Sequence, residues 1–265
     1  MTAISPAPAA PSTIPENGIA AYQRDGYVVI RRLFAADEIA ALRRTTEREL
    51  PDLEVLTKAD QAGNKVSLKM WNGAGEDIYG MFSRNERVVN IVERLIGDRV
   101  YLYHAKMILK NAHDGGAWEW HQDYGYWYHN GCLAPDMASC LIAVDPNTAE
   151  NGCLQVLRAS HRLGRLDHVR ENEQYVADSE RVNVAVTRFD NVPIPLEPGD
   201  AIFFHCNLLH RSDANNSDKR RWNFICSYNA TGNRPYKRER AYGHDGDLKI
   251  VPSDAIRALA AAAPG

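Results

Sequence analysis

Apolar residues in the first hundred positions recur at the three- to four-residue spacing that is typical of amphipathic helices. A short helix around Ile19 and Tyr22 is predicted to end at Gly26, because glycine tolerates the left-handed backbone of a helix end, and to lead into a strand. Two more helices are predicted, at 35–49, which Pro51 ends, and at 85–96, which Gly97 ends.

From about residue 100 onward the apolar residues gather instead into short runs rich in branched and aromatic side chains. Gly, Pro, Asn and Asp bound these runs, as is typical of strands joined by turns. Helices followed by many short strands predict a mainly β protein with flanking helices, built on a β-sandwich or jelly-roll core. The predicted strands are 100–109, 137–144, 153–157, 201–205 and 222–228.

Three stretches stand apart from this pattern. Residues 1–15 are rich in Pro, Ala and Ser, which predicts a disordered leader before a single domain over 16–265. Residues 165–196 are polar and poorly periodic, and such insertions often act as lids over a site. Near the end, Ser253 is expected to cap a last surface helix that runs to Ala263.

Composition narrows the functional classes. The formal net charge of −3 leaves no basic field for a phosphate backbone, so we expect no nucleic-acid partner. The five cysteines form no CxxC pair, which indicates free thiols and a cytoplasmic location. The N-terminus lacks the features of a signal peptide, and no apolar run is long enough for a membrane span. No interface pattern stands out, so the sequence leaves the oligomeric state open.

The stretch WHQDYGYWYHNG at 120–131 contains a candidate metal motif. His121 and Asp123 are two residues apart, and positions i and i+2 of a strand face the same side, so both side chains could reach one ion. A surface histidine near an aspartate is a common alternative. A third ligand is available after the Pro-Gly-Asp turn at 198–200, where an apolar strand is followed by His205 and His210.

Two histidines and one carboxylate on a β scaffold form the facial triad that binds iron(II) and leaves positions open. A 2-oxo acid would bind two of these positions and supply electrons for dioxygen. Its far carboxylate needs a cation, and Arg221 suits it because a guanidinium pairs with a carboxylate through two hydrogen bonds. A hairpin after His210 could return Arg221 beside it. The alternative is that Arg220 and Arg221 form a solvated basic pair, but the strand after them turns one of the two inward.

Three separated motifs, in this order, resemble the phytanoyl-CoA dioxygenase family of iron(II)/2-oxoglutarate-dependent oxygenases. The motifs are HQD at 121–123, TAENGCL at 148–154 with Ser160-His161, and PGD-FFH-LLH at 198–210 followed by Arg221. The resemblance implies a double-stranded β-helix (a cupin-like jelly roll), iron bound by His121, Asp123 and His210, and 2-oxoglutarate held by Arg221 with help from Ser212. His205 is then left with a structural role.

Within this family the chain is most similar in appearance to the ectoine hydroxylase branch. His104 stands where that branch has a glutamine that contacts substrate, and Ile108 stands where it has an asparagine. We therefore expect the reaction to be shared and the substrate to differ. Further substrate contacts are expected from Trp127, Tyr124, Trp118 and Lys69; ordinary core or rim aromatics and a solvated lysine are the alternatives. Trp118 reaches the pocket only if its strand contains a bulge.

The resemblance implies hydroxylation of an unactivated C–H bond in a small polar molecule, such as an amino acid or a specialised-metabolite intermediate. Iron(II) is the implied cofactor, with 2-oxoglutarate and O2 as cosubstrates and succinate and CO2 as products. The same cofactors could support desaturation, epoxidation or rearrangement, and an acyl-CoA substrate stays open. Rivals from other classes are a metal-binding jelly roll without turnover and a metal-dependent hydrolase.

Overall fold

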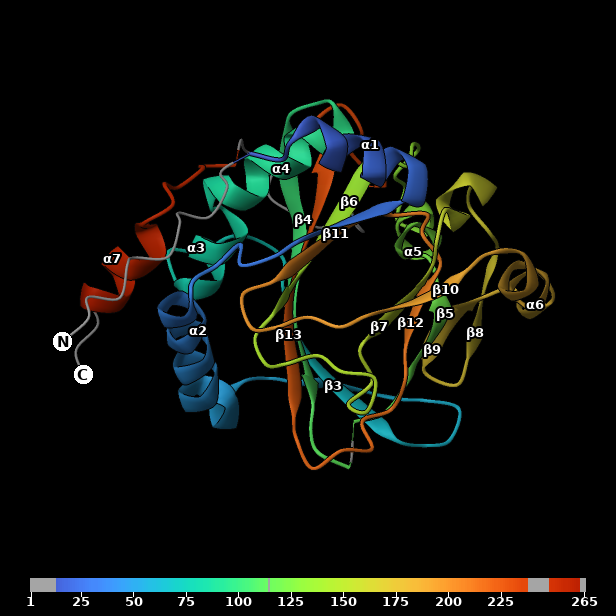
Figure 1. The fold of residues 1–265 in the computed structure, drawn as a ribbon, viewed down its shortest axis with the longest axis horizontal. Coiled ribbons are helices and arrows are strands. Elements are labelled where there is room, and N and C mark those ends of the chain that lie inside the picture. Colours follow the sequence, from blue (N-terminus) through green and yellow to red (C-terminus); the bar gives the residue numbers. More distant parts are fainter. Residues whose placement is uncertain (1–12, 114, 238–247, 263–265) are drawn as a thin grey trace.

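A computed structural model describes residues 13–113, 115–237 and 248–262. Its largest element is an antiparallel sheet of seven strands, in which neighbours in space are mostly distant in sequence (Figure 1). The order is β1 (Tyr27–Ile30), β11 (Ala201–His205), β6 (Met137–Ala143), β13 (Arg221–Ala230), β4 (Val100–Lys110), β3 (Lys65–Trp71) and β2 (Leu56–Ala59).

A smaller antiparallel sheet faces it, in the order β10 (Asn191–Ile194), β7 (Leu154–Leu157), β12 (His210–Ser212) and β5 (Trp118–His121). Apolar side chains of both sheets meet in one cluster, in which Leu141, Phe204 and Ile225 of the large sheet pack with Leu154 and Val156 of the small one. Two facing antiparallel sheets with crossing connections confirm the predicted jelly roll.

Helices cover the other face of the large sheet (Figure 1). Three of them confirm the helical periodicity of the sequence: α1 (Glu16–Asp25), α2 (Ala36–Glu49) and α4 (Glu86–Ile96). Gly26 and Gly97 end α1 and α4 with φ of 85° and 82°, the left-handed conformation expected at these ends. The remaining members of this layer are α3 (Ile78–Ser83) and α7 (Ala255–Ala262).

The segment 165–196 is more regular than its polar sequence indicates. It contains the hairpin of β8 (His168–Glu171) and β9 (Gln174–Ala177), then α6 (Ser179–Arg188), then β10 of the small sheet. The hairpin and helix expose one side to water, which accounts for their many polar residues. Strand β10 is part of the core sheet, and closure of this segment over the substrate stays a prediction.

Side-chain hydrogen bonds protect the free edge of the small sheet. Strand β5 lies at that edge, and Gln174 of β9 packs beside it. The backbone N–H of Glu119 donates to Oε1 of Gln174 at 3.1 Å, and Nε2 of Gln174 donates to the carbonyl of Ala117 at 3.0 Å. One amide side chain thus occupies the place where the backbone of another strand would pair.

The two ends of the domain differ in detail from expectation. Most of the expected leader, 1–12, lies outside the described residues, but Ile14 is fully buried, so packing begins before Glu16. Ser253 does not cap the last helix; its hydroxyl donates to Oε1 of Glu86 at 2.6 Å, and α7 begins at Ala255. Across the described ranges, none of the helices combines the length and apolarity that a membrane span requires.

Candidate metal centre

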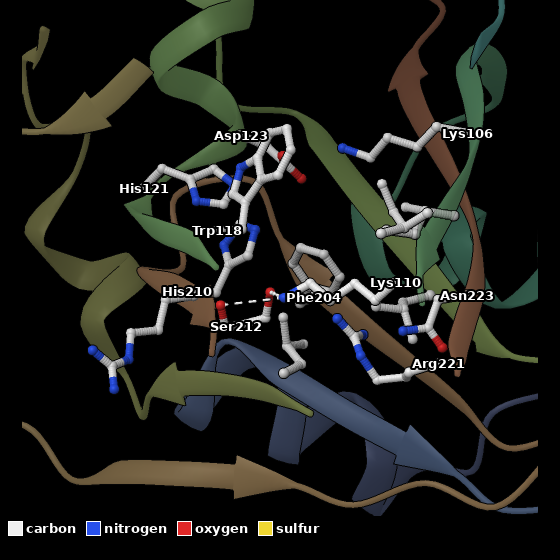
Figure 2. Close-up of a pocket in the computed structure, with 15 residues that line it drawn as sticks. Lys106, Lys110, Trp118, His121, Asp123, Phe204, His210, Ser212, Arg221 and Asn223 are labelled. Carbon is white, nitrogen blue, oxygen red and sulfur yellow. Dashed lines mark hydrogen bonds between the residues drawn. The ribbon is translucent and has the colours of Figure 1, made fainter. Parts of the chain in front are cut away.

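Strand pairing places two histidines side by side. His121 ends β5 and His210 begins β12, and the two residues lie directly opposite each other in the small sheet. Their ring centroids are 4.1 Å apart. Asp123 completes the group: one potential ligand atom from each of the three buried side chains lies within 4.8 Å of the others (Figure 2). The structure therefore brings together the three residues that the sequence singled out.

The local backbone of this motif differs from the prediction. His121 and Asp123 do not share a strand, because β5 ends at His121, Gln122 precedes the first helical turn, and Asp123 is the first residue of α5 (Asp123–His129). The two side chains converge through this change from strand to helix, and strand periodicity plays no part. The predicted convergence of the two side chains is confirmed, but the strand geometry expected for it was wrong.

Both imidazoles are held in the tautomer that a metal requires. Nδ1 of His121 lies 2.7 Å from the carbonyl of Glu119, and Nδ1 of His210 lies 2.9 Å from the carbonyl of Leu208. A carbonyl accepts only from N–H, so each Nδ1 carries the proton and each Nε2 keeps a free lone pair. Burial also lowers the pKa of both rings, which keeps them neutral and able to bind a cation.

Asp123 is held as a carboxylate. Oδ2 accepts a hydrogen bond of 2.8 Å from the Ser139 hydroxyl. Burial acts to raise the pKa of Asp123, but Lys106 and the two imidazoles, together with this hydrogen bond, lower it to about 2. Two neutral imidazoles and one carboxylate form a donor set that suits iron(II) and leaves coordination positions open.

Gln122, between two of these residues, joins the motif to two other segments. Its Nε2 donates to the carbonyls of Gly164 at 2.8 Å and Asn207 at 2.7 Å, and its Oε1 accepts from the N–H of Leu166 at 2.7 Å. Gln122 is fully buried. Sequence reasoning missed this role, and the only available signal was a polar residue inside an otherwise apolar and aromatic stretch.

A cavity extends from the three residues between the two sheets, with an empty volume of about 550 Å³ that includes its open mouth. Arg221, at the start of β13, lies at its far end (Figure 2). The expected hairpin between His210 and Arg221 was wrong: β12 and β13 belong to different sheets, and the two residues meet across the cavity. Arg220 is the half-exposed member of the pair and binds Glu47 and Asp145.

Arg221 has the properties of an anion-binding residue. It is buried, and burial lowers its pKa to about 10. Nη1 donates to Oδ1 of Asn147 at 3.4 Å, whereas Nε is buried without a hydrogen-bond partner among the described residues. A buried guanidinium with an unsatisfied N–H costs free energy unless an anion binds to it. This end of the cavity therefore fits a carboxylate.

Lys110 adds a second cation at this end. It is completely buried on β4, and its Nζ donates to Oγ of Ser212 at 2.9 Å and to the carbonyl of Asp213 at 2.6 Å. Burial lowers the pKa of Lys110 well below its usual value, and the neighbouring Arg221 lowers it further. An anion bound here would favour the protonated form of Lys110.

Of the residues expected to contact substrate, some line the cavity and others lie outside its lining. Trp118 lines the cavity, and the required bulge is present: the four residues of β5, from Trp118 to His121, oppose the three residues of β12. Tyr124 and Trp127 lie outside the cavity lining; they pack in a buried cluster with Tyr101, Tyr103, Cys132, Met137 and Cys206.

His104 and Lys69 also lie outside the cavity lining. The ring of His104 packs against that of Trp127, 5.9 Å between centroids, and burial lowers the pKa of His104 to about 3. Lys69 pairs with Met107, whose side chain belongs to the cluster beneath the helices. Directly paired residues share a face of a sheet, so Lys69 lies on the side opposite the cavity.

His205, the other candidate ligand, lies apart from the triad. Its Nδ1 accepts from the backbone N–H of Asn207 at 3.0 Å, and its ring centroid lies 5.4 Å from that of His161. Burial lowers the pKa of His205 to about 4, so the ring is neutral near pH 7. Its contacts are those of a residue that shapes the turn before His210.

Comparisons with known proteins agree with this geometry. An L-proline trans-4-hydroxylase of Streptomyces griseoviridis is 29% identical over 260 residues, which cover 89% of this chain and 95% of that protein. An ectoine dioxygenase of Sphingopyxis alaskensis is 29% identical over 231 residues, covering 81% of this chain and 76% of that protein.

Similar solved structures include EctD from S. alaskensis with 2-oxoglutarate and 5-hydroxyectoine, and the same protein with bound Fe. Each superposes with a TM-score of 0.76 and 27% identity, over 90% of this chain and 88% of the other. Residues 22–222, most of the chain, match the phytanoyl-CoA dioxygenase (PhyH) family. With its jelly roll, its His-Asp-His group and this match, the chain belongs to the phytanoyl-CoA dioxygenase family.

Proposed function

We propose that this protein is an iron(II)- and 2-oxoglutarate-dependent dioxygenase that hydroxylates a small polar molecule. One observation carries the proposal: two Nε2 atoms and a carboxylate converge on one side of a cavity whose far end holds a buried, incompletely paired guanidinium. A metal site with no cosubstrate has no need for that guanidinium. The relatives named for L-proline and ectoine support the same function, as do the two EctD structures, one with 2-oxoglutarate and one with Fe.

Each part of the site has a defined task in this proposal. His121, Asp123 and His210 would hold the iron, and Arg221 with Ser212 and Lys110 would bind the far carboxylate of 2-oxoglutarate. When bound, iron(II) supplies the oxidising chemistry with O2, as 2-oxoglutarate is converted to succinate and CO2. The carbonyls of Glu119 and Leu208 keep the proton on Nδ1 of each imidazole.

Apolar side chains keep the middle of the cavity dry. Leu141, Phe204 and Ile225 of the large sheet and Leu154 of the small sheet line the space between the three ligand residues and Arg221. Excluding water strengthens the ion pair of Arg221 with its carboxylate and limits side reactions at the open metal positions. We further propose that the chain from Ile14 onward forms one domain, because both sheets line this single site.

The test begins without oxygen. Iron(II) and 2-oxoglutarate are added to the protein, and a weak visible charge-transfer band is expected because the 2-oxo acid chelates the metal. Admitting air with candidate substrates should then release succinate in step with a hydroxylated product. The matched control replaces Arg211, at the cavity rim beside Trp120, by Lys and should keep the band. A wild-type protein that binds iron without any band would overturn the proposal and favour a non-catalytic binding protein.

A further inference from the structure

Lys106 lies in the cavity at the end opposite Arg221. Alternate residues of a strand share a face, so Lys106, Ile108 and Lys110 of β4 all line the cavity. Lys110 binds Ser212 beside Arg221, whereas the side chain of Lys106 extends toward Asp123 (Figure 2). At about 3.3 Å per residue, the two lysine Cα atoms are about 13 Å apart. The cavity thus has a cation at each end and the metal ligands near one of them.

The ammonium group of Lys106 has no ion pair or hydrogen bond with any residue that the structure describes. It is half-buried, and it faces a cavity that apolar side chains line together with polar and charged ones. A cation in partly desolvated surroundings without a partner costs free energy that a bound anion recovers.

2-Oxoglutarate does not supply that anion. Only four C–C bonds of about 1.5 Å separate its two carboxyl carbons, a span of about 5 Å when extended. With one carboxylate at Arg221, the other end of 2-oxoglutarate would extend toward His121, Asp123 and His210 and would serve there to bind the metal, so it would not pair with Lys106. Even with Lys110 neutral, iron(II), Arg221 and Lys106 together carry one positive charge more than Asp123 and 2-oxoglutarate neutralise.

We propose that Lys106 binds a carboxylate of the substrate, so that the enzyme acts on small carboxylic acids such as free amino acids. The inference rests on the proposed function and names the class of substrate for the same site. A single lysine suits a single negative charge; a phosphate or a coenzyme A tail needs several converging donors. Holding the acid group beside Asp123 would place the carbon skeleton of the substrate against the open metal positions.

A simpler role for Lys106 is to tune the charge of Asp123. The two roles differ in what they predict for ligands. A lysine that only tunes Asp123 affects acids and neutral analogues alike, whereas a lysine that binds substrate distinguishes a carboxylate from a carboxamide. The substitution Lys106→Arg keeps the positive charge and the ability to donate hydrogen bonds, whichever role Lys106 has. The comparison of an acid with its amide therefore decides between the two roles.

The experiment uses the full chain loaded anaerobically with iron(II) and 2-oxoglutarate. The probes are free L-amino acids and their carboxamides, with L-proline and L-prolinamide as the first pair. Binding is measured as a shift of the visible band. We expect acids and not amides to shift it, Lys106→Met to weaken acid binding about 10- to 100-fold, and Lys106→Arg to retain most of it. Lys69→Met is the matched control, because Lys69 lies on the other face of the sheet.

Several results would contradict the inference that Lys106 binds a substrate carboxylate. Equal shifts with acids and amides, no shift with any acid, or unchanged acid binding in Lys106→Met would all overturn it. If Lys106→Met loses the band of iron(II) and 2-oxoglutarate itself, Lys106 serves the metal site and the inference also fails. A wild-type protein that shows no band is a different result, because it contradicts the proposed function before any substrate is added.

Discussion

The backbone N–H of Gln122 donates a hydrogen bond of 2.9 Å to Nε2 of His168, which joins the segment between two metal-site residues to the hairpin of β8 and β9. Nδ1 of His168 lies 3.0 Å from the carbonyl of Leu166, so its proton is fixed and Nε2 is the acceptor. Gly125 allows this approach, since a Cβ there would lie 2.2 Å from Nδ1 of His168. The hairpin therefore takes part in shaping the site.

Replacing Gln122 by Ala should destabilise the protein and weaken iron binding. Three hydrogen bonds are lost, two of them buried and one part-buried. At about 1 kcal/mol each, with partners left unsatisfied, the free energy of unfolding should fall by about 2–4 kcal/mol. Denaturant unfolding of the metal-free protein measures this change. Gln61→Ala removes an exposed amide and should alter stability by less than about 0.5 kcal/mol. Equal effects of the two substitutions would contradict a structural role for Gln122.

Replacing Asp123 by Ala should abolish turnover while leaving the protein folded. The carboxylate is the only anionic member of the triad, and its removal leaves two neutral imidazoles to hold a dication. Iron(II) affinity and the visible band with 2-oxoglutarate report the loss, and circular dichroism reports the fold. Asp167→Ala, at an exposed carboxylate, is the control. Full activity in the Asp123 variant would refute its assignment as a ligand.

Replacing Arg221 by Met should have opposite effects on stability and on cosubstrate binding. Removing a buried and incompletely paired cation should stabilise the ligand-free protein by about 1–4 kcal/mol, whereas affinity for 2-oxoglutarate should fall about 100-fold or more. Thermal unfolding with and without 2-oxoglutarate measures both effects.

Arg220→Met is the control for that experiment, because Arg220 binds Glu47 and Asp145 outside the cavity lining. It should change the affinity for 2-oxoglutarate by less than about twofold. An Arg221→Met protein that binds 2-oxoglutarate as tightly as the wild type would show that the cavity holds its anion elsewhere, for example at Lys110.

Acid should destabilise the metal-free protein, beginning below about pH 6.5. Burial lowers the pKa of His104 to about 3 and those of His168 and His205 to about 4, so the unfolded chain binds protons that the folded chain excludes. The stability that these neutral rings contribute is present above pH 6.5 and is lost as the pH falls toward 4. Each ring contributes a slope of up to about 1.4 kcal/mol per pH unit.

Denaturant midpoints at pH 7.5 and 5.5 test this slope. Replacing His205 by Gln should reduce the pH dependence of stability, because the substitution removes one ring with a lowered pKa. His205 lies outside the His-Asp-His group, so the substitution leaves that group intact. A midpoint that does not vary between the two pH values would contradict burial as the cause of the lowered pKa values.

The sequence predicted which side chains come together better than it predicted the geometry that unites them. His121, Asp123, His210 and Arg221 stood out because metal-binding and guanidinium side chains are unusual beside apolar strands. The change from strand to helix at Gln122 was not predictable, since the residues after it form one aromatic run with no turn signal. Which sheet a strand joins depends on contacts far along the chain, so the crossing from β12 to β13 was read as a hairpin.

The substrate side of the site was the hardest part to read. Tyr124 and Trp127 were expected in the pocket, but side-chain type does not show whether an aromatic ring faces a cavity or a core. The signal for Lys106 was present: strand alternation in HAKMILK places residues 104, 106, 108 and 110 on one face. It remained ambiguous because either face of a buried strand can be the one that meets the cavity.

The amide of Gln174 has a consequence for solubility. An open strand edge offers N–H and C=O groups that can recruit a strand from another molecule, and aggregation often begins at such edges. Here the edge strand carries a candidate metal ligand and must stay near the cavity. By bonding to Glu119 and Ala117, Gln174 occupies the edge with one side chain that cannot be extended into a further strand. The hairpin of β8 and β9, whose polar sequence gave no clear strand pattern, thus shields this edge from self-association.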